Sequence, residues 1–282
     1  MVAFQIFWWD IYWYGIFYFI SFVLGYLCVF WIGKKQYFKK FPQLQLALTS
    51  NLDMLLIFVL LWVLVGGRLG HIFIYDFSHF IGHWWEIFAV WNGGMSFIGG
   101  IIGVVIAVLC YKFIYALQWK EFVLLFDIIL VLVPFGIFLG RFGNYLNQEL
   151  FGIIFTNSLW FSESMIAIFQ KLNFLHVYPK VDSFLRINTN QLSMCLEGGL
   201  LFLVNGILFR KQIRKKVISI GKISGWFLLL YSIIRFFLEY LRNDSQTEFI
   251  GIFTKSQWFF VFAFAISLWF LIYFAPKHEE NL

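Results

Sequence analysis

The chain has 282 residues, of which 61% are hydrophobic and 13% are charged, and its mean hydropathy is +0.81. This composition excludes a water-soluble globular domain and indicates a polypeptide whose solvent is the lipid bilayer. The net charge of +6 does not indicate a nucleic-acid-binding protein, because the lysines and arginines cluster in short segments between apolar runs.

Seven apolar segments are long enough for membrane-spanning helices, which need about 20 mainly apolar residues. In chain order they lie at about residues 12–33, 50–75, 87–111, 121–143, 192–209, 223–241 and 256–275. The sequence therefore predicts an all-α integral membrane protein with about seven transmembrane helices, which form a single polytopic domain over residues 1–282.

The connections between these segments predict the orientation. Lysines and arginines lie in the first, third and fifth connections, whereas the second, from Asp76 to Glu86, has neither. Because basic loops stay on the cytoplasmic side, we expect the N-terminus outside and the C-terminus in the cytoplasm. The fourth connection, residues 144–191, is the longest, and we expect it to form an extracytoplasmic cap.

A few charged residues interrupt the apolar segments, and such residues are costly in lipid and therefore candidates for function. Arg68 lies in the second segment and Arg141 near the outer end of the fourth. The sixth carries Arg235, Glu239 and Arg242 at i, i+4 and i+7, which places them on one helix face. We expect the arginines to meet in the outer half of the membrane.

Arginine suits an anionic lipid, because the guanidinium stays charged and its planar fork matches a phosphate bidentately. The expected ligand is a phospholipid headgroup. The alternative for any single arginine is a side chain that snorkels to the interface or pairs with Glu239. Three cysteines, Cys28, Cys110 and Cys195, sit at unrelated spacing, so the sequence predicts neither a metal site nor a disulfide framework, and no cofactor is expected.

Two segments combine glycine with polar groups. WNGGMSFIGGIIGVV, from Trp91 to Val105, allows close helix approach or a non-helical backbone beside a cavity, or simply small-residue packing. GRFGNYLNQELFG, from Gly140 to Gly152, has glycines on both sides of Arg141, with Asn144 and Glu149 following. These residues supply amide and carboxylate groups where the fourth segment reaches the membrane surface.

Together and in this order, these segments resemble the prolipoprotein diacylglyceryl transferase family, bacterial inner-membrane enzymes that act on lipoprotein precursors. The resemblance spans nearly the whole chain, and GRFGNYLNQELFG is its most specific part. The other matching segments are WYG at Trp13 to Gly15, GGRLG at Gly66 to Gly70, VWNGGMSF at Val90 to Phe97, and the spaced Arg235, Glu239 and Arg242.

The resemblance implies transfer of a diacylglyceryl group from phosphatidylglycerol to the lipobox cysteine of a bacterial preprolipoprotein, the first step of lipoprotein maturation, with release of glycerol 1-phosphate. The implied partners are phosphatidylglycerol, preprolipoprotein lipobox peptides and membrane lipids. The implied catalytic residues are Arg141, Arg235 and Glu149, the arginines stabilising charge on the leaving phosphate. The expected phosphatidylglycerol-binding residues are Arg141, Asn144, Arg235, Glu239, Arg242, Arg68 and Tyr14.

Two departures from the family pattern bear on activity. Ile98 stands where the family has a histidine that acts on the thiol, and an alkyl side chain cannot take a proton. Since a thiol with a pKa of about 8.5 is only slightly ionised near neutral pH, the reaction would be slowed but not forbidden. The segment before the fifth span, Ile187 to Gly199, keeps of the family motif only Gln191, Leu192, Glu197 and Gly198.

His71, three residues after Arg68, is the nearest substitute base by depth, and His79, His83 and Glu149 are further candidates. Two functions therefore stay open. One is an active transferase, and the other is a catalytically impaired relative that binds anionic phospholipid or prolipoprotein without transfer. An unrelated anion transporter would explain the arginines but not the ordered motifs.

Overall fold

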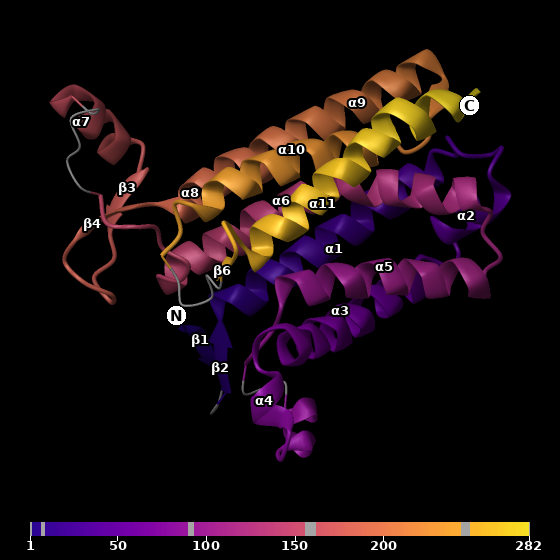
Figure 1. Cartoon of the computed structure of the whole chain (residues 1–282). Helices are drawn as coiled ribbons and strands as arrows, with labels where there is room; N and C mark the ends of the chain where they lie inside the picture. Colours follow the sequence, from indigo (N-terminus) through magenta and orange to yellow (C-terminus); the bar gives the residue numbers. More distant parts are fainter. Residues whose placement is uncertain (1, 7–8, 90–92, 156–161, 244–248, 282) are drawn as a thin grey trace. The chain divides into compact units, whose positions relative to one another are not determined.

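The computed structural model divides the chain into two compact units (Figure 1). The large unit comprises Met1–Gly25 and Phe126–Asn281, and the small unit comprises Tyr26–Leu125. The boundaries fall inside two long helices, α1 (Trp13–Lys34) and α6 (Trp119–Asn147). The structure describes residues 2–6, 9–89, 93–155, 162–243 and 249–281.

In the small unit, α3 and α5 pack along each other and carry most of the contacts. The hydroxyl of Ser96 accepts a hydrogen bond from the Gly99 amide at 3.1 Å and so caps the start of α5. The elements are α2 (Pro42–Ala47), α3 (Leu52–Tyr75), α4 (Phe77–Phe80), the 3-10 turn η1 (Trp84–Phe88) and α5 (Phe97–Ile114).

Glycines let the backbones of α3 and α5 approach closely. A Cβ atom on Gly66 would meet the carbonyl oxygen of Gly99, and one on Gly103 would meet the carbonyl of Trp62. Small residues spaced one turn apart commonly allow two membrane helices to pack closely. Gly93 and Gly94 serve a second purpose, because their φ angles of 82° and 72° give the non-helical turn that precedes α5.

This packing predicts opposite effects for two neighbouring glycines. Gly99→Ala is expected to lower the free energy of unfolding by roughly 1–3 kcal/mol, because its Cβ would strike the α3 backbone. Gly100→Ala is the matched control, since no described atom lies within 4 Å of its Cβ position, and alanine favours the helix. Thermal unfolding in detergent measures both, and equal melting temperatures for the two variants would contradict the packing.

In the large unit, α10 packs against α9 and α11, and the core between them contains Leu201, Phe227, Tyr231 and Phe260. Four short antiparallel strand pairs, β1–β2, β3–β4, β5–β8 and β6–β7, close the connections among the described residues. The elements up to the fifth apolar segment are β1 (Val2–Ile6), β2 (Trp9–Tyr12), α7 (Glu163–Lys171), β3 (Leu175–Val177), β4 (Leu185–Ile187), α8 (Thr189–Ser193), the π-helical η3 (Met194–Leu200) and α9 (Leu201–Lys215). The rest are β5 (Val217–Ser219), α10 (Lys222–Glu239), β6 (Phe249–Ile250), β7 (Phe253–Thr254), α11 (Lys255–Trp269), the π-helical η4 (Phe270–Phe274), the 3-10 turn η5 (Ala275–Lys277) and β8 (Glu279–Asn281).

A buried carboxylate fastens the start of α10 to α6. Asp127 of α6 accepts hydrogen bonds from the amides of Gly221 and Ser224 at 2.7 Å each, and from the Ser224 hydroxyl at 2.6 Å. The first amides of a helix have no partner within the helix and carry the positive end of its dipole, so a carboxylate satisfies them well. Asp127 thus fixes where α10 begins relative to α6.

Five helices of the described residues are long and apolar enough to cross a membrane. These helices expose large apolar side chains, as expected of surfaces that face lipid. Examples are Phe19, Leu203 and Phe262, each more than 60% exposed. The five are Gly15–Lys34, Leu52–Ile74, Trp119–Asn147, Thr189–Lys215 and Lys255–Lys277. The chain is an all-α integral membrane protein. The count of seven stays a prediction, because α5 is shorter and α10 carries three charged residues.

The predicted cap, residues 144–191, has different bounds in the structure. α6 continues to Asn147, and α8 begins at Thr189, so both ends of the predicted segment are helical. α6 ends in a backbone turn at Gln148, whose φ is 60° and whose amide donates to the Tyr145 carbonyl at 3.1 Å, while the Glu149 amide donates to the Asn144 carbonyl at 2.9 Å. Between these helices lie α7, β3 and β4, and their extracytoplasmic location stays a prediction.

Candidate active site

Five charged side chains of the large unit form a continuous row from α6 through η3 and α10 to the turn that follows α10. Glu197 Oε2 lies 3.5 Å from Arg141 Nε, and Glu197 Oε1 lies 3.6 Å from Arg235 Nη1. Arg235 Nη2 lies 3.4 Å from Glu239 Oε2, to which Arg242 Nη1 donates at 3.1 Å. We call these five residues the charged row. With all members ionised, its three arginines and two glutamates leave one excess positive charge.

The charged row is buried, so the excess charge matters. Glu197 has no exposed surface, Arg235 and Glu239 are each 5% exposed, and the side chain of Arg141 is 14% exposed. Buried guanidinium groups need anionic or hydrogen-bonding partners, so a row in which arginines outnumber glutamates favours an anionic ligand.

Arg141 is the member with donors to spare. Its Nε lies 3.5 Å from Glu197 in an ion pair, and its two terminal nitrogens make no hydrogen bond to the residues that the structure describes. Both oxygens of Glu197 also lack a hydrogen bond within the described part of the chain. The pairing therefore neutralises charge without occupying the planar fork, which can take two oxygens of a phosphate.

The local fold explains how Glu197 reaches two arginines on different helices. It lies in the π-helical turn η3, a rare conformation that often occurs at functional sites. The next residue, Gly198, packs against Phe138 of α6, where a Cβ would come within 2.7 Å of the Phe138 Cβ. The missing side chain lets η3 approach α6 closely, which brings the Glu197 carboxylate to Arg141.

Asn144 and Glu149 lie at the same end of α6. Asn144 follows Arg141 by three residues and so shares its helix face, and its Nδ2 donates to Glu149 Oε2 at 3.4 Å. Asn190 Nδ2 donates to the Glu149 carbonyl at 2.7 Å and ties this turn to α8. Among the described residues, Asn144 is the side-chain partner of Glu149.

Arg68 belongs to the small unit. Its guanidinium donates to the backbone carbonyls of Glu86, Ile87, Gly93 and Gly94. These four bonds account for the burial of its charge, since only 6% of Arg68 is exposed. In the structure Arg68 holds the connection between α3 and α5, and its contact with lipid stays a prediction.

The sequence pattern of the family described as prolipoprotein diacylglyceryl transferase matches residues 1–273. The chain belongs to this family. Among its relatives is the phosphatidylglycerol–prolipoprotein diacylglyceryl transferase of Nitrosospira multiformis, which is 36% identical over 250 residues, covering 87% of this chain and 76% of the relative. The protein of the same name from Legionella pneumophila (strain Lens) is 34% identical over 265 residues, covering 92% and 91%. That from Haemophilus influenzae (strain PittEE) is 32% identical over 246 residues, covering 87% and 81%.

Two of the transferase-family motifs lie partly outside the described residues. Val90 to Asn92 of the VWNGGMSF segment are not described, and of Tyr14 the structure gives the position in α1 but not the side chain. Ile98 is half-buried in the first turn of α5. The positions of Tyr14 and Ile98 relative to a bound lipid therefore stay predictions.

The histidines differ in how well each suits proton transfer from a thiol. In the small unit, a Cβ on Gly94 would come within 2.7 Å of the His71 ring and 2.9 Å of Arg68 Nη1, so His71 lines the turn that leads to Ile98. His79 Nε2 donates a hydrogen bond to the Glu86 carboxylate at 3.0 Å, which raises the pKa of His79 and makes its imidazole less available as a base near neutral pH. His71 remains the better placed of the two.

His176 was not considered in the sequence analysis. It lies in β3 of the large unit, with Nε2 3.5 Å from the hydroxyl of Tyr145, the residue after Asn144. Burial lowers the pKa of His176 below its ordinary value, so its imidazole is neutral near pH 7. Sequence spacing gave no sign of this contact, because 31 residues separate the two side chains.

Glu197 is the most informative residue that the sequence analysis left out of the candidate site. It was noted as a retained member of the motif before the fifth span, without a role. The available signal was physical, because Glu197 is the acid within an apolar segment of membrane-spanning length, and such residues mark functional sites by default.

Proposed function

We propose that this protein transfers a diacylglyceryl group from phosphatidylglycerol to the lipobox cysteine of bacterial preprolipoproteins, the first step of lipoprotein maturation. The observation that carries the proposal is the buried charged row, together with the fork of Arg141, whose terminal nitrogens make no hydrogen bond to the described residues. The names of the relatives, which contain phosphatidylglycerol, prolipoprotein and diacylglyceryl transfer, support the same substrates.

In the proposed reaction, the cysteine sulfur forms a bond to the glyceryl carbon of the lipid while the bond from that carbon to a phosphate oxygen breaks. Glycerol 1-phosphate leaves, and the thiol proton passes to a base or to water. Negative charge grows on the departing phosphate, where Arg141 and Arg235 stabilise it electrostatically. Glu239 and Arg242 hold Arg235 in place, while Asn144 and Glu149 orient the headgroup.

The remaining expected lipid contacts, Arg68 and Tyr14, belong to the same proposal. The proposed location is the bacterial inner membrane, with seven spans, the N-terminus outside and the C-terminus in the cytoplasm. The basic connections support this orientation. It puts the end of α6 that carries Arg141 and Asn144, together with the connection to α8, on the outer side.

The central experiment is direct. Purified protein is incubated with phosphatidylglycerol and a lipobox peptide, and mass spectrometry is used to look for the diacylglyceryl adduct on the cysteine. We expect the adduct. Its absence, under conditions in which one of the named relatives modifies the same peptide, would favour the second function, a relative that binds anionic lipid or prolipoprotein without transfer. Ile98 is the observation that favours this second function.

Ile98→His tests whether the missing imidazole limits the rate. We expect the substitution to raise the rate of transfer at least tenfold, since a positioned general base contributes roughly 10²–10⁴-fold. Ile98→Gln is the control, because it adds a polar group of similar size that takes no proton. Equal rates for the parent and Ile98→His would indicate another base, and His71→Gln and His176→Gln would then identify which imidazole serves.

A further inference from the structure

The end of α9 remote from Glu197 carries a groove of about 410 Å³. Its lining combines one aliphatic side chain with four cationic ones. The lining residues are Ile207, Arg210, Lys211, Arg214 and Lys215, and we call the recess the basic groove.

Among the described residues, no ion pair offsets the four cations of the basic groove. They occupy positions i, i+1, i+4 and i+5 of one helix, so that like charges face each other one turn apart and repel. All four are exposed, and the described residues supply neither an ion pair nor a side-chain hydrogen bond to any of them. An anion seated among them would relieve this repulsion.

The basic groove lies about one membrane thickness from the charged row. Arg214 follows Glu197 by 17 residues along η3 and α9, which corresponds to about 25 Å at 1.5 Å per residue. The hydrocarbon core of a bilayer is about 30 Å thick. If the charged row faces the headgroups of one leaflet, the basic groove faces the headgroups of the other.

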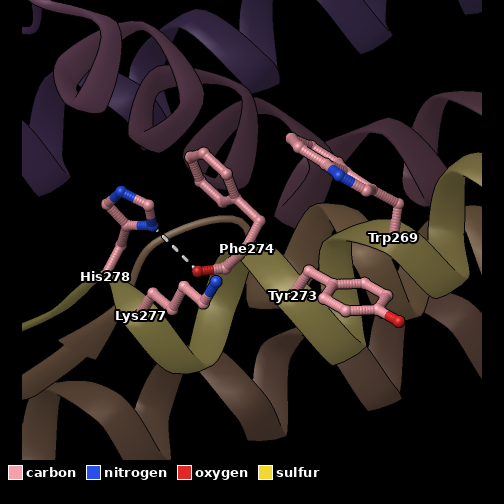
Figure 2. A pocket seen from close by; sticks show the side chains of 5 residues that line it. All are labelled: Trp269, Tyr273, Phe274, Lys277 and His278. Atoms are coloured by element: carbon pink, nitrogen blue, oxygen red, sulfur yellow. Dashed lines mark hydrogen bonds between the residues drawn. The ribbon is translucent and has the colours of Figure 1, made fainter.

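Aromatic side chains lie at the same level as the basic groove, where α11 ends. Figure 2 shows Trp269, the last residue of α11, and Tyr273 in the following η4, before Lys277 and His278, and both residues are more than half exposed. Tryptophan and tyrosine gather at the headgroup level of membranes. The chain then continues into β8, which pairs with β5 directly after α9, so the ends of α9 and α11 lie together.

We propose that the basic groove binds the phosphate of an anionic phospholipid in the leaflet opposite the charged row. The arginines and lysines contact the phosphate, and Ile207, which is 64% exposed, contacts the start of an acyl chain. This lipid is a resident ligand and not a substrate, because the charged row lies at the other end of the helix. The protein would thus bind anionic lipid at two sites, the basic groove and the proposed substrate site at the charged row.

The test measures bound lipid on the intact full-length protein. Delipidated protein is titrated with phosphatidylserine in micelles and examined by native mass spectrometry, with phosphatidylcholine as the uncharged reference. The double variant Lys211→Gln/Arg214→Gln is expected to bind phosphatidylserine roughly tenfold to thirtyfold more weakly, since each basic residue near a membrane surface contributes measurably to binding of anionic lipid. The single variants are expected to show intermediate affinity.

Two further variants make the result specific. Lys39→Gln/Lys40→Gln removes the same charge from an exposed basic segment of the small unit and is expected to bind like the parent. Arg141→Gln is expected to weaken lipid binding at the charged row and to leave lipid binding at the basic groove unchanged. Unchanged binding by Lys211→Gln/Arg214→Gln, or an equal loss in Lys39→Gln/Lys40→Gln, would overturn the proposal. Displacement of the lipid by inorganic phosphate would also overturn it, because the groove would then take a free anion.

Discussion

Arg141→Gln is expected to lower kcat/KM for diacylglyceryl transfer by roughly 10²–10³-fold, the usual effect of removing one preorganised donor to developing charge. The reason is the unoccupied fork of Arg141 beside Glu197, which matches two phosphate oxygens. Arg141→Lys is expected to recover only part of the loss, since an ammonium cannot bind bidentately. Initial rates at several phosphatidylglycerol concentrations, followed by mass spectrometry of the lipobox peptide, give the measurement.

Lys171→Gln provides the matched control for loss of one positive charge. Lys171 is exposed at the end of α7. Its replacement by glutamine is expected to leave kcat/KM unchanged. If Arg141→Gln is folded and retains the parent value, the phosphate does not sit on Arg141. The proposed role of the charged row would then be wrong.

Glu197→Gln is expected to lower the free energy of unfolding by roughly 3–5 kcal/mol, the usual cost of leaving a buried charge without its partner. The substitution keeps the shape but removes the carboxylate charge between Arg141 and Arg235. The change is measured by circular dichroism as the protein unfolds in mixed micelles that contain an increasing fraction of denaturing detergent. Glu163→Gln, an exposed acid in the first turn of α7, is the control and is expected to have little effect.

A double-mutant cycle separates charge pairing from packing. Glu197→Gln/Arg235→Gln removes one charge of each sign, so we expect it to be less destabilised than the sum of the single variants. The difference measures the coupling between the two side chains. Additive effects would show that Glu197 contributes by packing alone, and would contradict its role as the bridge of the charged row.

The spacing of the charged residues predicted some of the contacts that the structure contains. Arg235 and Glu239 share a face of the end of α10, as i, i+4 spacing requires, and Arg242 contacts Glu239 from the turn that follows this helix. The same reasoning placed Arg141 near them, and the structure supplies Glu197 as the link. Local spacing could not name that link, because Arg141 and Glu197 are brought together by packing between helices.

The sequence reasoning was less informative where backbone atoms are the partners. Arg68 was grouped with the other arginines by depth alone, yet its donors bind carbonyl oxygens of the turn before α5. Carbonyl groups carry no signature in the sequence, so a buried arginine that they satisfy looks the same as one that awaits a ligand. Likewise, hydrophobicity predicted the apolar helices but not the exact end of α6, which the backbone turn at Gln148 sets.

The Asp127 contact with the start of α10 has a mechanical consequence. It joins α6 and α10 at a point about 15–20 Å along their axes from Arg141 and Arg235. Glu197 links the same two helices a second time, near the end of α10, through Arg141 and Arg235. With contacts at both levels, α6 and α10 resist a change of their crossing angle, so the spacing of the two arginines is set before a lipid binds.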